Sequence, residues 1–183
     1  MKLFRAVMLA LALASGFIGS AAAQGAGADL EALRTGLAKL EFLAGDWRAD
    51  GKIHPRPLGG GGDTAGTVKT NRGVGMRYVV TDYTTTLPGG LPYAAHTLIT
   101  FAPRGDTYVA YGFNNLLPLP LVYRGKFAND TTLVMETGVD PNSKGQQRLT
   151  YTRNADGSVG LVVENSGDGG KTFSRQSELT MRK

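Results

Sequence analysis

Short β-rich runs separated by turn residues fill most of this chain, and they constrain its fold more than any other feature. Ten such runs follow one another from residue 47 onward, rich in β-branched and aromatic residues. The expected strands are Trp47–Ile53, Thr64–Thr70, Gly73–Thr86, Tyr93–Phe101, Thr107–Phe113, Leu121–Phe127, Thr131–Thr137, Gln146–Thr152, Val159–Glu164 and Thr172–Met181. One helix is expected before them, because four leucines recur there at helical spacing: Leu30, Leu33, Leu37 and Leu40.

The connections between these runs are nearly all short. Short connections favour pairing between neighbours in the sequence, which produces an antiparallel meander. A meander of this length closes on itself more easily than it stays open with two unpaired edges. We therefore predict an all-β fold, an antiparallel meander closed into a barrel of about ten strands with one short N-terminal helix.

The first 23 residues have the order of a secretory signal peptide. A basic start with Lys2 and Arg5 precedes an apolar run over Ala6–Ile18, and small residues follow at Ala21–Ala23. The apolar run is shorter than the ~20 residues that a spanning helix needs, so no transmembrane anchor is expected. The pattern predicts a periplasmic or secreted protein.

Removal of residues 1–23 leaves 160 residues, which is enough for one domain with its own core. We expect residues 24–28 to form a flexible lead and residues 29–183 a single barrel domain. The chain has no cysteine, which excludes disulfides and thiolate chemistry. Its formal net charge falls from +5 to +3 without Lys2 and Arg5, and the other basic residues are scattered, so nucleic-acid binding is not expected.

Four motifs occur in order along the chain. They are LEFLAGDW over Leu40–Trp47, the glycine-led Gly75–Tyr78, the segment Thr100–Asp106 with Tyr108 after it, and the closing hairpin Asn165–Phe173 with the final strand running to Lys183. Together they resemble a family of bacterial secreted proteins of unknown function with a lipocalin-like, calycin-type barrel. The resemblance implies the fold and secretion, and it supplies no activity.

The same resemblance implies a structural role for the one tryptophan. In lipocalin-type barrels a tryptophan early in the first strand plugs the closed end, and an arginine from the final strand lies across it. By position this implies a plug made by Trp47 and either Arg182 or Arg175, through a cation–π contact of ~0.5–2 kcal/mol.

Residues for catalysis are few. No Gly-x-Ser-x-Gly motif occurs, and His54 and His96 are the two histidines. An enzyme, either a hydrolase or an isomerase, would need His96 within hydrogen-bond distance of a carboxylate in a pocket. The last strands hold no histidine, which argues against haem. We therefore predict no catalytic residue, no metal and no cofactor.

Aromatic residues concentrate on the middle strands. A tyrosine-rich lumen offers an apolar wall with polar tips, which suits a small apolar or amphiphilic ligand. The residues that we predict to line the lumen and bind the ligand are Tyr78, His96, Tyr111, Phe113 and Tyr123.

Two classes of function are favoured, with a hydrolase or isomerase as a third, less favoured alternative. The first is non-enzymatic binding of a small, largely apolar ligand in the barrel lumen. The second is a structural or protein-interaction module with a filled core, which would act through the apolar loop Leu116–Leu121 or a strand edge. A cavity of ligand size favours the first, and an exposed apolar patch without a cavity favours the second.

Overall fold

The computed structural model describes residues 27–55 and 60–183. The predicted signal peptide, residues 1–23, lies outside the described residues, as do residues 24–26 of the expected lead. Residues 27 and 28 of that lead are already helical.

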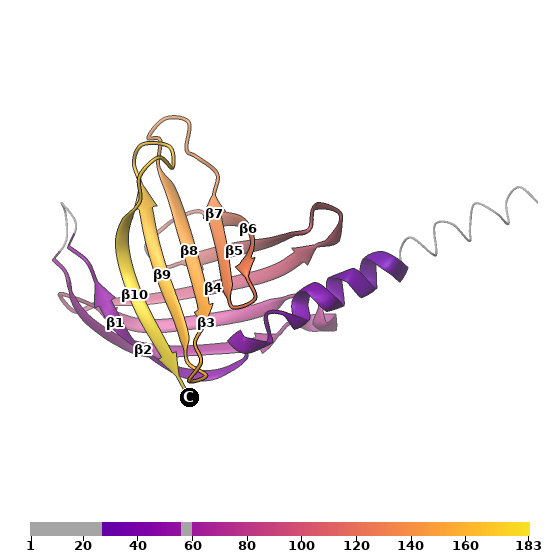
Figure 1. The fold of residues 1–183 in the computed structure, drawn as a ribbon. Helices are drawn as coiled ribbons and strands as arrows, with labels where there is room; N and C mark the ends of the chain where they lie inside the picture. The colour runs from indigo at the N-terminus through magenta and orange to yellow at the C-terminus, as the bar shows by residue number, and fades with distance from the viewer. Residues whose placement is uncertain (1–26, 56–59) are drawn as a thin grey trace, which may run out of the picture.

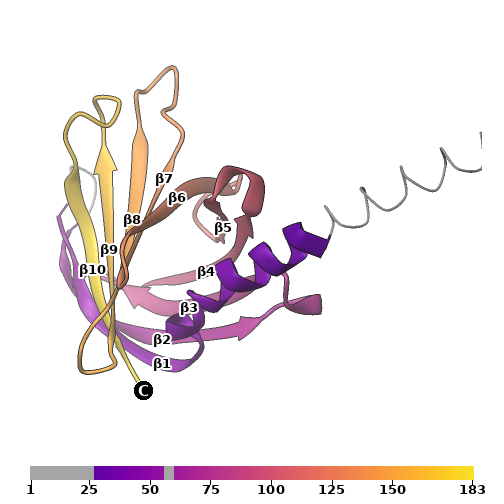
Figure 2. The same ribbon diagram turned by 45° about the vertical axis from the view of Figure 1, so that its right-hand side comes forward.

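Ten antiparallel strands close into a barrel, as the sequence predicts (Figures 1 and 2). Each strand pairs with its neighbours in the sequence, and β1 closes the barrel by pairing with β10. The strands are β1 (Gly45–Ile53), β2 (Gly62–Arg72), β3 (Val79–Leu87), β4 (Leu91–Ala102), β5 (Thr107–Asn114), β6 (Leu121–Asn129), β7 (Thr132–Thr137), β8 (Gln146–Arg153), β9 (Val159–Ser166) and β10 (Ser174–Arg182). Closure pairs the first and last strands of the meander, which removes two edges that would otherwise be open to association.

The third strand begins later than the predicted Gly73–Thr86, at Val79. The residues before it form the short 3-10 turn η2 (Val74–Met76), in which the φ angles of Gly75 and Met76 are 66° and 51°. The Tyr78 ring lies so close to Gly73 that any larger residue at 73 would overlap it. This close approach requires glycine, and the turn replaces the first part of the expected strand.

The helix covers residues 27–38, and the 3-10 turn η1 (Glu41–Leu43) joins it to β1. This helix, drawn in indigo in Figure 1, packs on the end of the barrel where β4 ends and β5 begins. There the Tyr108 hydroxyl donates a hydrogen bond of 2.8 Å to the Gly36 carbonyl. The Phe101 ring occupies the space that a Cβ at position 36 would take. The helix therefore docks through a glycine, at a position where helix propensity alone disfavours that residue.

The apolar core fills the end of the barrel that the helix covers. Its largest fully buried side chains are Leu40, Ile99, Leu133, Met135 and Val159. The four strand members come from the ends of β4, β7 and β9 at this side of the barrel. They point inward because alternate residues of a strand face opposite sides of the sheet.

Trp47 belongs to this core, with 5% of its surface exposed. Its indole Nε1 donates a hydrogen bond of 2.9 Å to the Leu43 carbonyl. The cation over its ring is Lys183, whose Nζ lies 4.7 Å from the ring centroid, and not Arg182. Arg182 lies opposite Arg48 of β1, so its side chain points to the outer face of the barrel. The side chain of the next residue, Lys183, reaches back over the Trp47 ring. The expected pairing of Trp47 with Arg182 or Arg175 is corrected accordingly.

Candidate ligand-binding cavity

The half of the lumen away from the helix is not filled. It holds a cavity of about 1070 Å³, lined by residues from all ten strands. Sites for drug-sized ligands commonly have about 300–1,000 Å³, so this volume suits a small molecule. Leu43, Val68 and Met181 belong to both the cavity lining and the apolar core, which therefore forms the cavity floor.

The cavity wall is largely uncharged. Its side chains are mainly leucine, valine, tyrosine, threonine, asparagine and glutamine. No lysine, arginine or glutamate of the described residues lines it, and apart from tyrosines its ionisable groups are His54 and Asp140. His54 follows β1 and Asp140 follows β7, so both lie at the open end. A ligand deeper in the lumen meets neutral groups only.

Polarity along the wall of β8, β9 and β10 changes with depth. On β8 the inward positions run from Gln147 near the mouth to Leu149 and Tyr151 below it. On β9 the polar residues Ser166 and Asn165 lie nearest the mouth, with two apolar residues, Val163 and Leu161, below. The inward positions of β10 follow the same order, from polar Gln176 and Ser177 to apolar Leu179 and Met181. Three neighbouring strands thus present a polar upper layer over an apolar lower layer.

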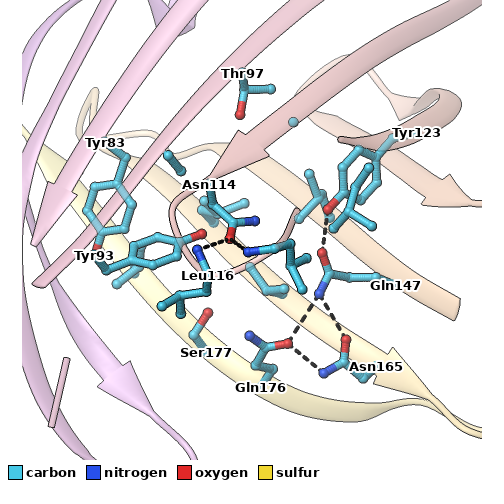
Figure 3. A pocket seen from close by; sticks show the side chains of 18 of the residues that line it. Tyr83, Tyr93, Thr97, Asn114, Leu116, Tyr123, Gln147, Asn165, Gln176 and Ser177 are labelled. Carbon is cyan, nitrogen blue, oxygen red and sulfur yellow. Dashed lines mark hydrogen bonds between the residues drawn. The ribbon is translucent and has the colours of Figure 1, made fainter. Parts of the chain in front are cut away.

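The polar upper layer is one hydrogen-bonded network, which we call the amide cluster: Tyr123, Gln147, Asn165 and Gln176 (Figure 3). The Tyr123 hydroxyl donates to Gln147 Oε1. Gln147 Nε2 donates to Asn165 Oδ1 at 3.0 Å and to Gln176 Oε1 at 3.2 Å. Asn165 Nδ2 also donates to Gln176 Oε1. Each of the three amides holds its neighbours, so the cluster is positioned before any ligand arrives.

A β-bulge in β10 brings Gln176 into the lumen. The pairing of β10 with β9 shifts between Arg175, opposite Glu164, and Ser177, opposite Val163. In a regular strand consecutive residues point to opposite faces, but the extra residue of a bulge breaks this alternation. As a result Gln176 and Ser177, adjacent in the sequence, both line the cavity.

Several hydroxyls on the wall lack protein partners. The buried Tyr83 hydroxyl has none among the described residues. Ser177 and Tyr151 are each 6% exposed, and neither hydroxyl forms a hydrogen bond within residues 27–55 and 60–183. Figure 3 shows the Ser177 hydroxyl beside the amide cluster, pointing toward Leu116. Buried polar groups normally have partners, so such hydroxyls are available to a bound molecule.

The lumen tyrosines stay neutral over a wide pH range. Burial raises the pKa of Tyr151 to about 12, and the nearby Tyr93 adds to the rise. The pKa of Tyr123 is also raised, chiefly by burial and then by the neighbouring Tyr151. Burial likewise raises the pKa of Tyr83, whose ring contacts Tyr93 edge to face at 5.9 Å between centroids. Their phenols therefore act as hydrogen-bonding groups rather than charges.

Apolar side chains surround the mouth. Leu116 and Leu117 line the cavity and are each 47% exposed, and Leu119 in the same loop is 75% exposed. The loop is held in shape by Asn114, whose Oδ1 accepts hydrogen bonds from the amides of Leu116 and Leu117 at 2.9 and 3.0 Å (Figure 3). The next residue, Asn115, ties the loop to β4 by bonding Ala94 N and Pro92 O.

The five residues predicted to line the lumen are divided by the structure. Tyr123 lines the cavity as part of the amide cluster. Phe113 touches only the rim of the cavity: it shares the phase of Tyr111, and its ring lies beside His96 on the outer face with 48% of its surface exposed. Tyr78, His96 and Tyr111 do not line it. Tyr78 packs on the turn before β3. His96 and Tyr111 alternate with lining residues on β4 and β5, so they face outward, which corrects their predicted position.

His96 does pair with a carboxylate, but on the outer face of the barrel. Its Nδ1 lies 2.6 Å from Asp82 Oδ1, with about half of each side chain exposed. The Phe113 ring is its neighbour at 6.4 Å between centroids. The enzyme hypothesis needs this pair inside a pocket, and the pair lies outside the cavity.

The part of the chain that the structure describes contains no group of three or more histidine, aspartate or glutamate side chains arranged to hold a metal ion. It also has no helix long and apolar enough to cross a membrane.

Sequence reasoning missed the polar half of the site: Gln147, Asn165, Gln176 and Ser177. One signal was present, because Gln147 stands at the inward phase of a predicted strand that continues with Leu149 and Tyr151. A side-chain amide that points into the barrel needs hydrogen-bond partners, and those of Gln147 come from β6, β9 and β10. The phase of Gln176 was not available from the pattern, because it depends on the bulge.

Comparison with known proteins places the chain in a family of unknown function. Residues 37–172 match a family model described as "Protein of unknown function (DUF1579)". No curated protein matches the sequence. Among solved structures, the crystal structure of Rv2717c from M. tuberculosis is similar in fold, with a TM-score of 0.61 and 13% sequence identity over 81% of this chain and 96% of that chain. Because the family model covers about three quarters of the sequence, the chain belongs to the DUF1579 family.

Proposed function

We propose that this protein binds a small, largely apolar ligand in the barrel lumen and does no chemistry on it, in the periplasm or outside the cell. The observation that carries the proposal is the cavity of about 1070 Å³ inside an otherwise well-packed closed barrel. Folded proteins rarely leave such space empty, because interiors are close-packed and a void loses contacts. A binding role explains why the core fills one half of the lumen only.

The mouth supports the same proposal. From Tyr83 to Pro103 and from Thr107 to Tyr123 the chain has no aspartate, glutamate, lysine or arginine. These segments form the loops 88–90 and 115–120 at the open end and the strands that lead into them. An apolar ligand entering there would pass no charged side chain from this side of the mouth.

The export part of the proposal rests on the residue order of the first 23 positions. Its test is N-terminal sequencing of the protein recovered from the periplasmic fraction and the medium of a bacterial host. A mature N-terminus close to residue 24 is expected. The uncleaved chain in the cytoplasmic fraction would contradict it.

Binding in the lumen is tested with N-phenyl-1-naphthylamine, a neutral dye whose fluorescence rises in apolar surroundings. We expect saturable binding to the mature protein. The variant Ala95→Trp puts a large side chain into the cavity and should weaken binding by roughly ten-fold, which corresponds to about 1.4 kcal/mol. Ala94→Trp is the matched control, because Ala94 is exposed on the outer face of the same strand.

The two variants decide between the lumen and the surface. Equal dye affinity in Ala95→Trp, Ala94→Trp and the unchanged protein would place the dye elsewhere. The proposal would then be wrong, and the exposed loop Leu116–Leu121 would become the favoured functional surface. Absence of any saturable dye binding would also contradict the proposal.

A further inference from the structure

The lumen wall distinguishes one end of a bound molecule from the other. On β8, β9 and β10 the polar residues lie near the mouth and the apolar residues lie toward the floor. A ligand that is uniformly apolar would leave without partners the polar groups that the amide cluster does not pair, among them the amide nitrogen of Gln176 and the hydroxyl of Ser177. The arrangement therefore matches a molecule with one polar end and one apolar end.

The polar layer offers mainly donors to the ligand. Gln176 Oε1 is already used, because it accepts bonds from both Gln147 and Asn165. The amide nitrogen of Gln176 has no partner among the described residues, and Figure 3 shows it on the Ser177 side of the cluster. The buried Ser177 hydroxyl stands next to it, because the bulge turns both residues inward. A carbonyl or hydroxyl oxygen placed there would accept from both.

The polar layer offers no countercharge. The ionisable groups on the lining other than tyrosines are His54 and Asp140, and the imidazole of His54 lies 3.3 Å from Glu178 Oε1. A carboxylate or an ammonium group brought to the amide cluster would lose hydration without gaining an ionic partner. Burying an unpaired charge is far more costly than burying a hydrogen-bonded neutral group.

We propose that the lumen holds an uncharged, single-chain amphiphile, such as a medium-chain fatty amide, ester or alcohol, with its tail toward the floor. The head oxygen accepts hydrogen bonds from Gln176 and Ser177. The tail lies against the apolar layer formed by Leu149, Leu161 and Leu179. This rests on the lumen binding proposed above and adds the chemical class and the orientation of the ligand.

Displacement of N-phenyl-1-naphthylamine by ten-carbon compounds tests the head group. Decanamide and 1-decanol should displace the dye at concentrations roughly ten-fold or more below those of decanoate and decyltrimethylammonium at neutral pH. The double variant Gln176→Leu/Ser177→Ala should bring the ratio between decanamide and decanoate close to one. Thr180→Ala, on the outward phase of the same strand, is the control and should keep the ratio.

Orientation has an independent readout, because Trp47 is the one tryptophan and lies in the core at the closed end. A bromine on a bound chain quenches tryptophan fluorescence at short range. Decanamide brominated at carbon 10 should quench Trp47 more strongly than decanamide brominated at carbon 4. Stronger quenching by the carbon-4 compound would reverse the proposed orientation.

The outcomes separate the two proposals. If the dye does not bind, or binds outside the lumen, lumen binding itself fails and this inference fails with it. If the dye binds in the lumen and decanoate displaces it as well as decanamide does, the head-group assignment alone is wrong. Selectivity that survives Gln176→Leu/Ser177→Ala would likewise overturn the assignment of the polar subsite.

Discussion

At the scale of single residues, the phase of a side chain decides its role. Lys183 covers the Trp47 ring and Arg182 does not, although the two are neighbours in the sequence. Gln176 and Ser177 share the lumen because one bulge suspends the alternation between them. In both cases a shift of one residue changes which group meets the interior.

The plug at the closed end leads to a stability prediction. Lys183→Met should lower the free energy of unfolding by about 0.5–1 kcal/mol, since it removes a cation from the face of the indole. Arg182→Met should change it by less. Urea unfolding followed by the fluorescence of Trp47 measures both variants. A larger loss in Arg182→Met would contradict the placement of Lys183 over the ring.

At the scale of elements, the contacts of the helix override its intrinsic propensity. Gly36 is a poor helix former, yet only glycine leaves room for the Phe101 ring and keeps its carbonyl within reach of Tyr108. The turn before β3 follows the same rule, because the approach of Tyr78 requires Gly73. At Gly36 and Gly73, glycine is unfavourable for the local backbone but lets a side chain of another segment pack closely against it.

Substitution of Gly36 tests this account of helix docking. Gly36→Ala should destabilise the protein by about 1–3 kcal/mol through overpacking against Phe101, despite the better helix propensity of alanine. Thr35→Ala, at an exposed position of the same helix, should be neutral or slightly stabilising. Thermal or urea unfolding compares the two. A gain of stability in Gly36→Ala would show that the helix does not pack as described.

At the scale of the whole molecule, a barrel closed by ten strands is filled at one end and hollow at the other. The division follows from the helix, which covers the end where Leu40 and Leu43 join the strand core. The other end keeps its cavity and exposes apolar loop residues around the mouth. Stability therefore resides in one half of the barrel, and the proposed binding function resides in the other.

The buried tyrosines predict that the fold weakens at alkaline pH. Burial raises the pKa values of Tyr108 and Tyr151 from 10.0 to about 12, and the Asp106 carboxylate adds to the rise at Tyr108. The unfolded chain releases these protons first as the pH rises. The stabilisation is therefore complete below about pH 10 and is lost toward pH 12, by about 1.4 kcal/mol per pH unit for each such group.

Urea unfolding at several pH values between 8 and 12 measures this slope. Tyr151→Phe should reduce the decline between pH 10 and 12, because one of the buried phenols is gone. Between pH 7 and 9 the variant and the unchanged protein should show the same pH dependence. An equal decline in both above pH 10 would mean that Tyr151 ionises in the folded state as readily as in the unfolded chain.

The sequence by itself determined the all-β barrel of ten strands, because strand content, turn spacing and short connections are local properties. It also identified Trp47 as a buried core residue and Tyr123 as a residue of the cavity wall. Tertiary structure alone decided which faces of β4 and β5 turn inward, which cation meets Trp47, and that the lumen is hollow. The physical reason is that strand phase, the β10 bulge and cavity volume depend on the register of closure, and closure joins residues at opposite ends of the chain.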